Sequence, residues 1–126
     1  MDHKLQQFKA DFFKTLSHPL RIRILELLRE GDKFVNELQS ELGVDGSVVS
    51  QQLALLRNKN IVLGKKDGTK VTYTVRDPLI FELLDVARRI FNNNLTDTIS
   101  LLQQMEQDPI NTEQIEGDVP PSVSKK

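Results

Sequence analysis

The chain contains no cysteine and no tryptophan among its 126 residues. The absence of cysteine excludes disulfides, thiolate metal ligands and cysteine nucleophiles together. No apolar run approaches the roughly 20 residues that a membrane helix needs, and the first residues lack the basic-then-apolar pattern of an export signal. We therefore expect a cytoplasmic protein that does not enter a membrane.

Sequence motifs of catalysis are also missing. The chain has no nucleophile elbow, no phosphate-binding loop and no metal-binding helix motif. Its two histidines, His3 and His18, are far apart in sequence. We therefore expect neither an enzyme nor a bound cofactor or metal, and the length suits one domain with a modest core.

Charge is nearly balanced over the whole chain, with a formal net charge of -1, but it is unevenly distributed. Between residues 57 and 76, six basic residues stand against the single acid Asp67, a net charge of +5. The six are Arg57, Lys59, Lys65, Lys66, Lys70 and Arg76. Such a local patch favours contact with phosphates, although lysines on an edge strand can also serve only solubility.

The last residues, 108–126, are expected to be a disordered tail. They combine several acids with Pro109, Pro120 and Pro121, and few apolar residues. Their acids offset the basic segment in the total charge. The predicted division is therefore a structured part over residues 1–107 and a tail over 108–126.

Apolar residues three or four positions apart predict four helices in the first half of the chain. The expected ranges are 3–16 for the first helix, 33–42 for the third and 47–58 for the fourth. The second helix is expected to begin at Pro19 and to be ended by Gly31-Asp32. Pro19 suits the first turn of the second helix, with Ser17 or His18 at its cap. A role for His18 as a ligand or pH sensor is the less favoured alternative.

A turn containing Gly43 and Gly46 separates the third helix from the fourth. The fourth helix should bury Val49, Leu53 and Leu56 on one face. Its opposite face is small, polar and free of acids, and consists of Ser47, Ser50, Gln51 and Ala54. A short helix, a turn and a second helix together form a helix-turn-helix. In this motif the second helix enters the DNA major groove. The alternative is a polar face that only meets solvent.

Two predicted strands, 61–66 and 70–76, flank the hairpin-turn signal Asp67-Gly68, and the second alternates β-branched residues. A β-hairpin directly after a helix-turn-helix is a wing. The predicted fold class is therefore mainly α with a small β-hairpin, a winged helix-turn-helix.

Asp77 and Pro78 should cap and begin a further helix. An apolar stripe follows from residue 80 to 91, and another from 95 to 105. Asn92-Asn93-Asn94 lies between them and should interrupt or end the helix, so residues 78–107 are expected as one helix or two.

The apolar stripes of the terminal helices exceed what a small core covers, which favours a symmetric dimer over a small-molecule pocket. The residues expected in the dimer interface are Leu5, Phe8, Phe12, Ile80, Leu83, Leu84, Ala87, Ile90 and Phe91.

Two stretches carry a family resemblance. Residues 13–28, FKTLSHPLRIRILELL, resemble the opening "ALSHPLRLRILELL" of ArsR/SmtB-type winged-helix repressors, and residues 47–57, SVVSQQLALLR, resemble their "STVSxHLxxLR". The resemblance implies a homodimeric bacterial repressor that binds operator DNA. It also implies groove contacts from Ser47, Ser50, Gln51 and Gln52, and contacts to the DNA backbone from the basic residues Arg57, Lys65, Lys66 and Lys70.

The chain departs from this family at its signal-sensing positions. Phe34 and Asn36 stand where the family's third helix has two cysteines, and Ala87 stands where a C-terminal histidine ligand is expected. A thiolate-bound metal is therefore excluded as the effector. A small organic molecule, a hard metal at carboxylates and no effector at all remain open. Gln52 replaces a frequent histidine, and glutamine pairs well with adenine.

The sequence thus predicts a sequence-specific DNA-binding transcriptional regulator, a homodimeric repressor of a near-palindromic operator. The alternative is a winged helix that serves as a protein-interaction module and has little DNA affinity.

Overall fold

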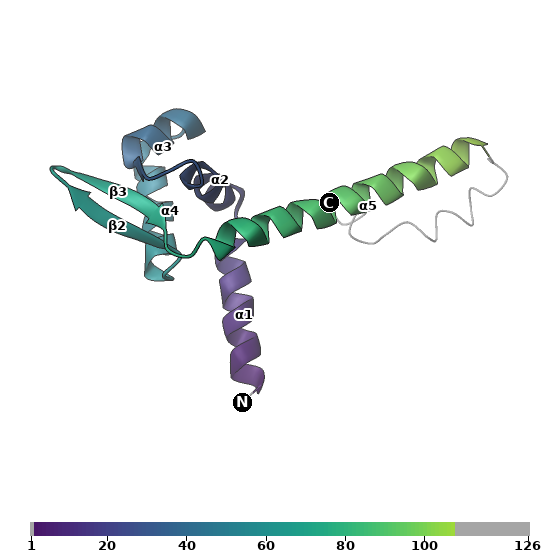
Figure 1. The fold of residues 1–126 in the computed structure, drawn as a ribbon, viewed down its shortest axis with the longest axis horizontal. Helices are drawn as coiled ribbons and strands as arrows, with labels where there is room; N and C mark the ends of the chain where they lie inside the picture. The colour runs from purple at the N-terminus through teal and green to yellow at the C-terminus, as the bar shows by residue number, and fades with distance from the viewer. Residues whose placement is uncertain (1, 108–126) are drawn as a thin grey trace. The chain divides into compact units, whose positions relative to one another are not determined.

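The computed structural model describes residues 2–107, so the tail expected at 108–126 lies outside the described residues. The elements follow one another as α1 (Asp2–Leu16), α2 (Pro19–Leu28), β1 (Lys33–Phe34), α3 (Val35–Leu42), α4 (Gly46–Asn58), β2 (Val62–Asp67), β3 (Lys70–Val75) and α5 (Leu79–Gln107) (Figure 1). Two compact units divide the chain between Phe81 and Glu82, inside α5. Across residues 2–107, no helix has the combined length and apolarity to cross a membrane.

The core of the first unit lies between α2, α3, α4 and the sheet. Seven side chains are fully buried there: Ile24, Leu25, Leu38, Val49, Leu53, Leu56 and Val62. The three from α4 are four and three residues apart, as the apolar pattern predicted. Each leucine or isoleucine that is removed from water in this way stabilises the fold by about 1.5–3 kcal/mol.

The start of α2 is capped as the sequence predicted. The backbone N–H of Leu20 donates to Nδ1 of His18 over 3.1 Å, and Pro19 occupies the first turn, where its missing N–H costs nothing. The capping role of His18 is therefore confirmed.

The third helix begins later than predicted, because residues 33 and 34 form a strand. β1 pairs antiparallel with β3, with Lys33 opposite Tyr73 and Phe34 opposite Thr72, and the strand order is β1-β3-β2. The N–H of Phe34 donates to the Glu37 carboxylate over 2.8 Å, which places the start of α3 at Val35. The helical interpretation of residues 33–34 was wrong.

The predicted wing is present as the hairpin of β2 and β3. Val62 pairs with Val75 at one end and Asp67 with Lys70 at the other. Gly68 in the turn has φ +67, a left-handed conformation that glycine adopts without strain.

The asparagines at 92–94 do not interrupt the last helix. α5 is continuous for 29 residues, and the Thr98 hydroxyl donates back to the carbonyl of Asn94 over 2.9 Å. Asparagine costs only a few tenths of a kcal/mol more than alanine inside a helix, and no glycine or proline breaks the stretch. The predicted interruption was therefore wrong. The predicted cap at Asp77 is confirmed, because its Oδ1 accepts from the N–H of Leu79.

Gly43 offers a test of the turn before α4. It ends α3 with φ 68 and ψ 32, and a Cβ added there would meet nothing within 4 Å. Gly43→Ala should therefore lower the free energy of unfolding by about 1 kcal/mol through backbone strain alone. Gly43→Asn should lower it less, since asparagine tolerates this conformation. Urea denaturation measures both, and an alanine variant as stable as the wild type would contradict the assigned conformation.

Candidate nucleic-acid interface

α4 is held by the side chains of its inner face. Val49, Leu53 and Leu56 are each 0% exposed, and the helix packs against α2, α3 and β2. The turn before it places Asp45 at the cap, where its carbonyl accepts from the N–H groups of Val48 and Val49. Helix α3, this turn and α4 form the predicted helix-turn-helix.

The outer face of α4 is exposed and uncharged. Ser47, Ser50 and Gln51 are exposed, as is Ala54, and α4 contains no acidic residue. Sequence reasoning missed Asn58, which is also exposed and follows Ala54 by one turn and Gln51 by two. Its place on the same helical face was visible in the spacing.

Gln52 has a different environment from its neighbours. It is half-buried, and its Oε1 accepts from Nη1 of Arg21 over 2.8 Å. Nε of the same arginine donates to the carbonyl of Thr15. The structure thus joins Gln52 to α1 and α2 rather than leaving its side chain free.

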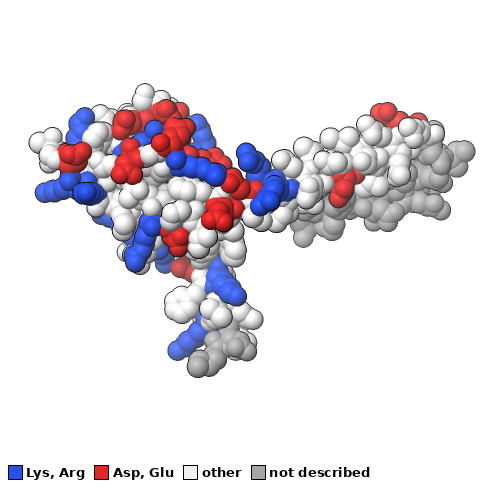
Figure 2. Space-filling view, in the orientation of Figure 1, with Lys and Arg blue, Asp and Glu red and all other residues white. Residues whose placement is uncertain are grey.

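Basic side chains gather at the end of the hairpin, where β2 ends at Asp67, and acidic side chains gather over α2 and α3 with basic ones among them (Figure 2). Lys65, Lys66 and Lys70 are exposed on β2 and β3. In the part of the chain that the structure describes, none of these lysines forms a salt bridge, whereas Lys59 pairs with Asp11 at 3.0 Å. The charges of Lys65 and Lys66 are therefore available to a ligand, whereas Nζ of Lys70 lies over the ring of Phe34.

Arg57 connects α4 with the hairpin. It is exposed at the end of α4, and a Cβ placed on Gly64 would lie 3.7 Å from its guanidinium, so that group lies beside β2. The same Cβ would lie 3.2 Å from Tyr73, so glycine at this position leaves room for the ring. Arg57 thus extends the basic surface from the hairpin to the outer face of α4.

The residues predicted to form a dimer interface differ in exposure. Leu5 and Phe8 are 56% and 72% exposed, and Ile90 and Phe91 are 57% and 61% exposed. Ala87 is exposed as well, whereas Phe12, Leu83 and Leu84 are half-buried. Ile80, by contrast, is only 7% exposed, so little of its surface is accessible to a partner.

Further exposed apolar residues on the terminal helices were not among those predicted. They are Phe13, Leu79, Val86, Leu95, Ile99 and Leu102. The last three continue the apolar stripe of α5, so the spacing contained the signal.

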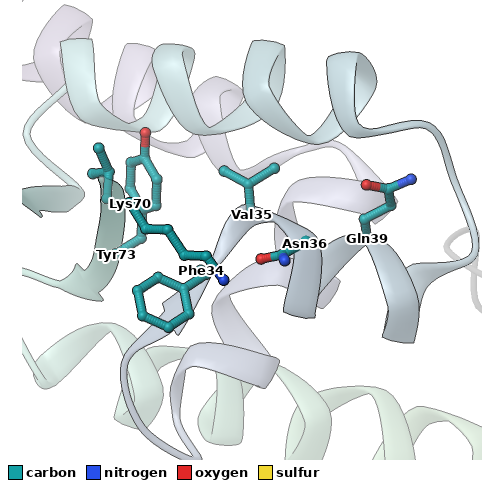
Figure 3. Close-up of a pocket in the computed structure, with 7 residues that line it drawn as sticks. Phe34, Val35, Asn36, Gln39, Lys70 and Tyr73 are labelled. Atoms are coloured by element: carbon teal, nitrogen blue, oxygen red, sulfur yellow. The ribbon is translucent and has the colours of Figure 1, made fainter. Parts of the chain in front are cut away.

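A cavity of about 370 Å³ lies between α3, β1 and β3 (Figure 3). Phe34, Val35 and Tyr73 give it an apolar lining, and Nζ of Lys70 lies 5.0 Å from the centroid of the Phe34 ring. Asn36, which also lines it, and Phe34 are the residues that stand in place of the two cysteines. Within residues 2–107, no three acidic or histidine side chains are grouped so that they would hold a metal ion.

Comparison with known proteins decides the family. A model described as "Bacterial regulatory protein, arsR family" matches residues 18–63. The uncharacterized HTH-type transcriptional regulator Rv0081 of Mycobacterium tuberculosis is 46% identical over 102 residues, which are 80% of this chain and 90% of the relative. The chain belongs to the ArsR family. The resemblance seen in the sequence is confirmed, and the named relatives in this family are transcriptional regulators, not enzymes.

Solved structures agree with this assignment. The crystal structure of M. tuberculosis Rv0081 matches with a TM-score of 0.71 and 48% identity, over 75% of this chain and 96% of that one. The transcriptional repressor BigR from Xylella fastidiosa matches with a TM-score of 0.60 and 31% identity, over 72% and 90%. The predicted winged helix-turn-helix is confirmed. The alternative of a protein-interaction module is not favoured for an ArsR-family chain.

The two faces of α4 should respond differently to truncation. Leu53→Ala removes a fully buried side chain and should lower the free energy of unfolding by about 2–5 kcal/mol. Ser50→Ala, on the exposed face, should change it by less than about 0.5 kcal/mol. Both values come from urea denaturation. Equal losses would mean that the outer face is packed in the folded chain.

Proposed function

We propose that this ArsR-family protein is a homodimeric transcriptional repressor that binds operator DNA through α4 and the β2–β3 hairpin. The observation that carries the proposal is the juxtaposition of an uncharged, exposed helix face with unpaired lysines of the hairpin. Ser47, Ser50, Gln51 and Gln52 are the proposed groove residues. The proposed contacts to the DNA backbone are Arg57, Lys65, Lys66 and Lys70.

Physical chemistry supports this division of roles. Short polar side chains on a helix approach base edges closely and exchange hydrogen bonds with them. Lysine and arginine contact phosphates, which adds affinity and sets the register without selecting sequence. The acidic side chains over α2 and α3 lie away from the hairpin end in Figure 2, so they leave that end attractive to phosphate.

The proposed partner for the apolar terminal helices is a second copy of the chain. Exposed Phe8 on α1 and Phe91 on α5 are large apolar groups that water disfavours. A structural neighbour from Mycobacterium bovis is described as a homodimeric winged helix-turn-helix DNA-binding domain, at 22% identity. A two-fold dimer would present two copies of α4, which calls for a near-palindromic operator with half-sites about one helical turn, or a multiple of it, apart. Residues 1–107 would carry these functions, in the cytoplasm.

Binding should weaken steeply as salt rises, because phosphate contacts release counterions. Each phosphate contact contributes roughly 0.9 to the slope of log affinity against log salt concentration. The double variant Lys65→Gln/Lys66→Gln removes two such contacts from each protomer, so its slope should be less steep by about 2 per protomer. A matched variant, Lys4→Gln/Lys9→Gln on α1, removes the same charge away from the hairpin and should keep the wild-type slope. Mobility-shift titration with DNA from the protein's own promoter measures these slopes. Salt-insensitive binding, or none, would contradict the proposal.

Gln51→Ala should reduce affinity for the operator by about tenfold or more, since one good base contact supplies roughly 1–3 kcal/mol of discrimination. Affinity for unrelated DNA should change little. Competition titration gives both values. Equal losses on the two DNAs would show that Gln51 does not contact a base.

A further inference from the structure

Gln52 is the one groove residue proposed above whose amide is already bound to another side chain. Its Oε1 accepts from Nη1 of Arg21 over 2.8 Å, and the residue is half-buried. Gln51, its neighbour on the outer face, is exposed. The Gln52 amide is therefore held in one orientation by Arg21, whereas the exposed Gln51 side chain can rotate to suit the DNA.

Arg21 is itself held in place from a second side. Its Nε donates to the carbonyl of Thr15 at the end of α1, and Thr15 is only 5% exposed. The Thr15 hydroxyl donates to the Asp11 carbonyl over 2.9 Å. Because a guanidinium is a rigid planar group, the bond at Nε fixes the direction in which Nη1 points toward α4.

The chemistry of the two groups determines how the glutamine amide is oriented. A guanidinium offers only donors, so the amide must present its oxygen to Arg21 and turn its NH₂ group away. A free glutamine can present both groups, and recognition of adenine uses both, with oxygen accepting from N6 and nitrogen donating to N7. A glutamine whose oxygen is bound to a cation offers chiefly the NH₂ donor.

We propose that Arg21 is a positioning residue for base recognition, which holds Gln52 so that its amide donates to an acceptor on the base edge. Guanine offers two acceptors in the major groove, O6 and N7, and thymine offers O4, whereas adenine offers N7 alone. The N6 amine of adenine needs the amide oxygen that Arg21 already occupies, so a glutamine held in this way should favour guanine or thymine over adenine. This inference rests on the proposed function, since it requires α4 to lie in the groove. It replaces the adenine preference that the sequence predicted for Gln52.

The first test removes the guanidinium. Arg21→Met keeps an unbranched side chain but no donor, so the Gln52 amide becomes free to rotate. Selection of operator variants from a randomised duplex library, followed by sequencing, should show guanine or thymine for the wild type at the base pair that Gln52 contacts. In Arg21→Met, adenine should gain at least about fivefold relative to guanine and thymine there, equivalent to roughly 1 kcal/mol.

Arg23→Met is the matched control. It removes the same charge two residues along α2, from an exposed side chain. Its base preferences should equal those of the wild type, even if affinity falls uniformly. Circular dichroism and thermal melting establish that each variant is folded.

A second variant keeps the Arg21 contact and removes the donor. Gln52→Glu still offers an oxygen to the guanidinium, but its outward atom becomes an acceptor. Selection should then move toward cytosine, whose N4 amine donates, at the same base pair. If Arg21→Met does not fold, this variant still identifies the base pair that Gln52 contacts, and the base that the wild type selects there decides between a bound and a free amide oxygen.

Two results would overturn the role of Arg21. One is an unchanged base preference in folded Arg21→Met, or in Gln52→Glu, while the wild type binds specifically. The other is selection of adenine by the wild type at the base pair whose identity changes in Gln52→Glu. Failure of the wild type to select any sequence would instead overturn the proposed function.

Discussion

The burial of three side chains of α4 is the constraint on which the rest of the structure depends. Val49, Leu53 and Leu56 are fully buried against α2, α3 and β2. A helix with one face held in this way has no rotational freedom about its axis, so its other face must point outwards. Every proposed contact with base edges follows from that orientation, and so does the position of Gln52 at the edge of the exposed face.

The sequence predicted most of this arrangement because its signals are local. Apolar spacing gave the helices, and Asp67-Gly68 gave the hairpin. The two errors have physical reasons of a different kind. Strand β1 is only two residues long and exists because Lys33 and Phe34 pair with β3, a contact made across some forty residues of sequence. The run Asn92–Asn94 has weak helix propensity, but the apolar stripes on both sides continue the same helix.

The sequence predicted which residues make up the candidate site, but not which of their side chains contact one another. Exposure of Ser47, Ser50 and Gln51 followed from the helical period. The bond between Arg21 and Gln52 did not, because no sequence pattern specifies which side chains meet across 31 positions. The burial of Ile80 could not be predicted for the same reason. Its spacing is that of an interface residue, yet only 7% of its surface is exposed.

The central claim is that α4 and the hairpin together form the DNA-binding surface. The most direct measurement is amide NMR of the ¹⁵N-labelled full chain, titrated at low salt with a short duplex from its own promoter. The largest shifts should fall on residues 46–58 of α4 and 62–75 of the hairpin. Shifts confined to α5, or none at low salt, would contradict it.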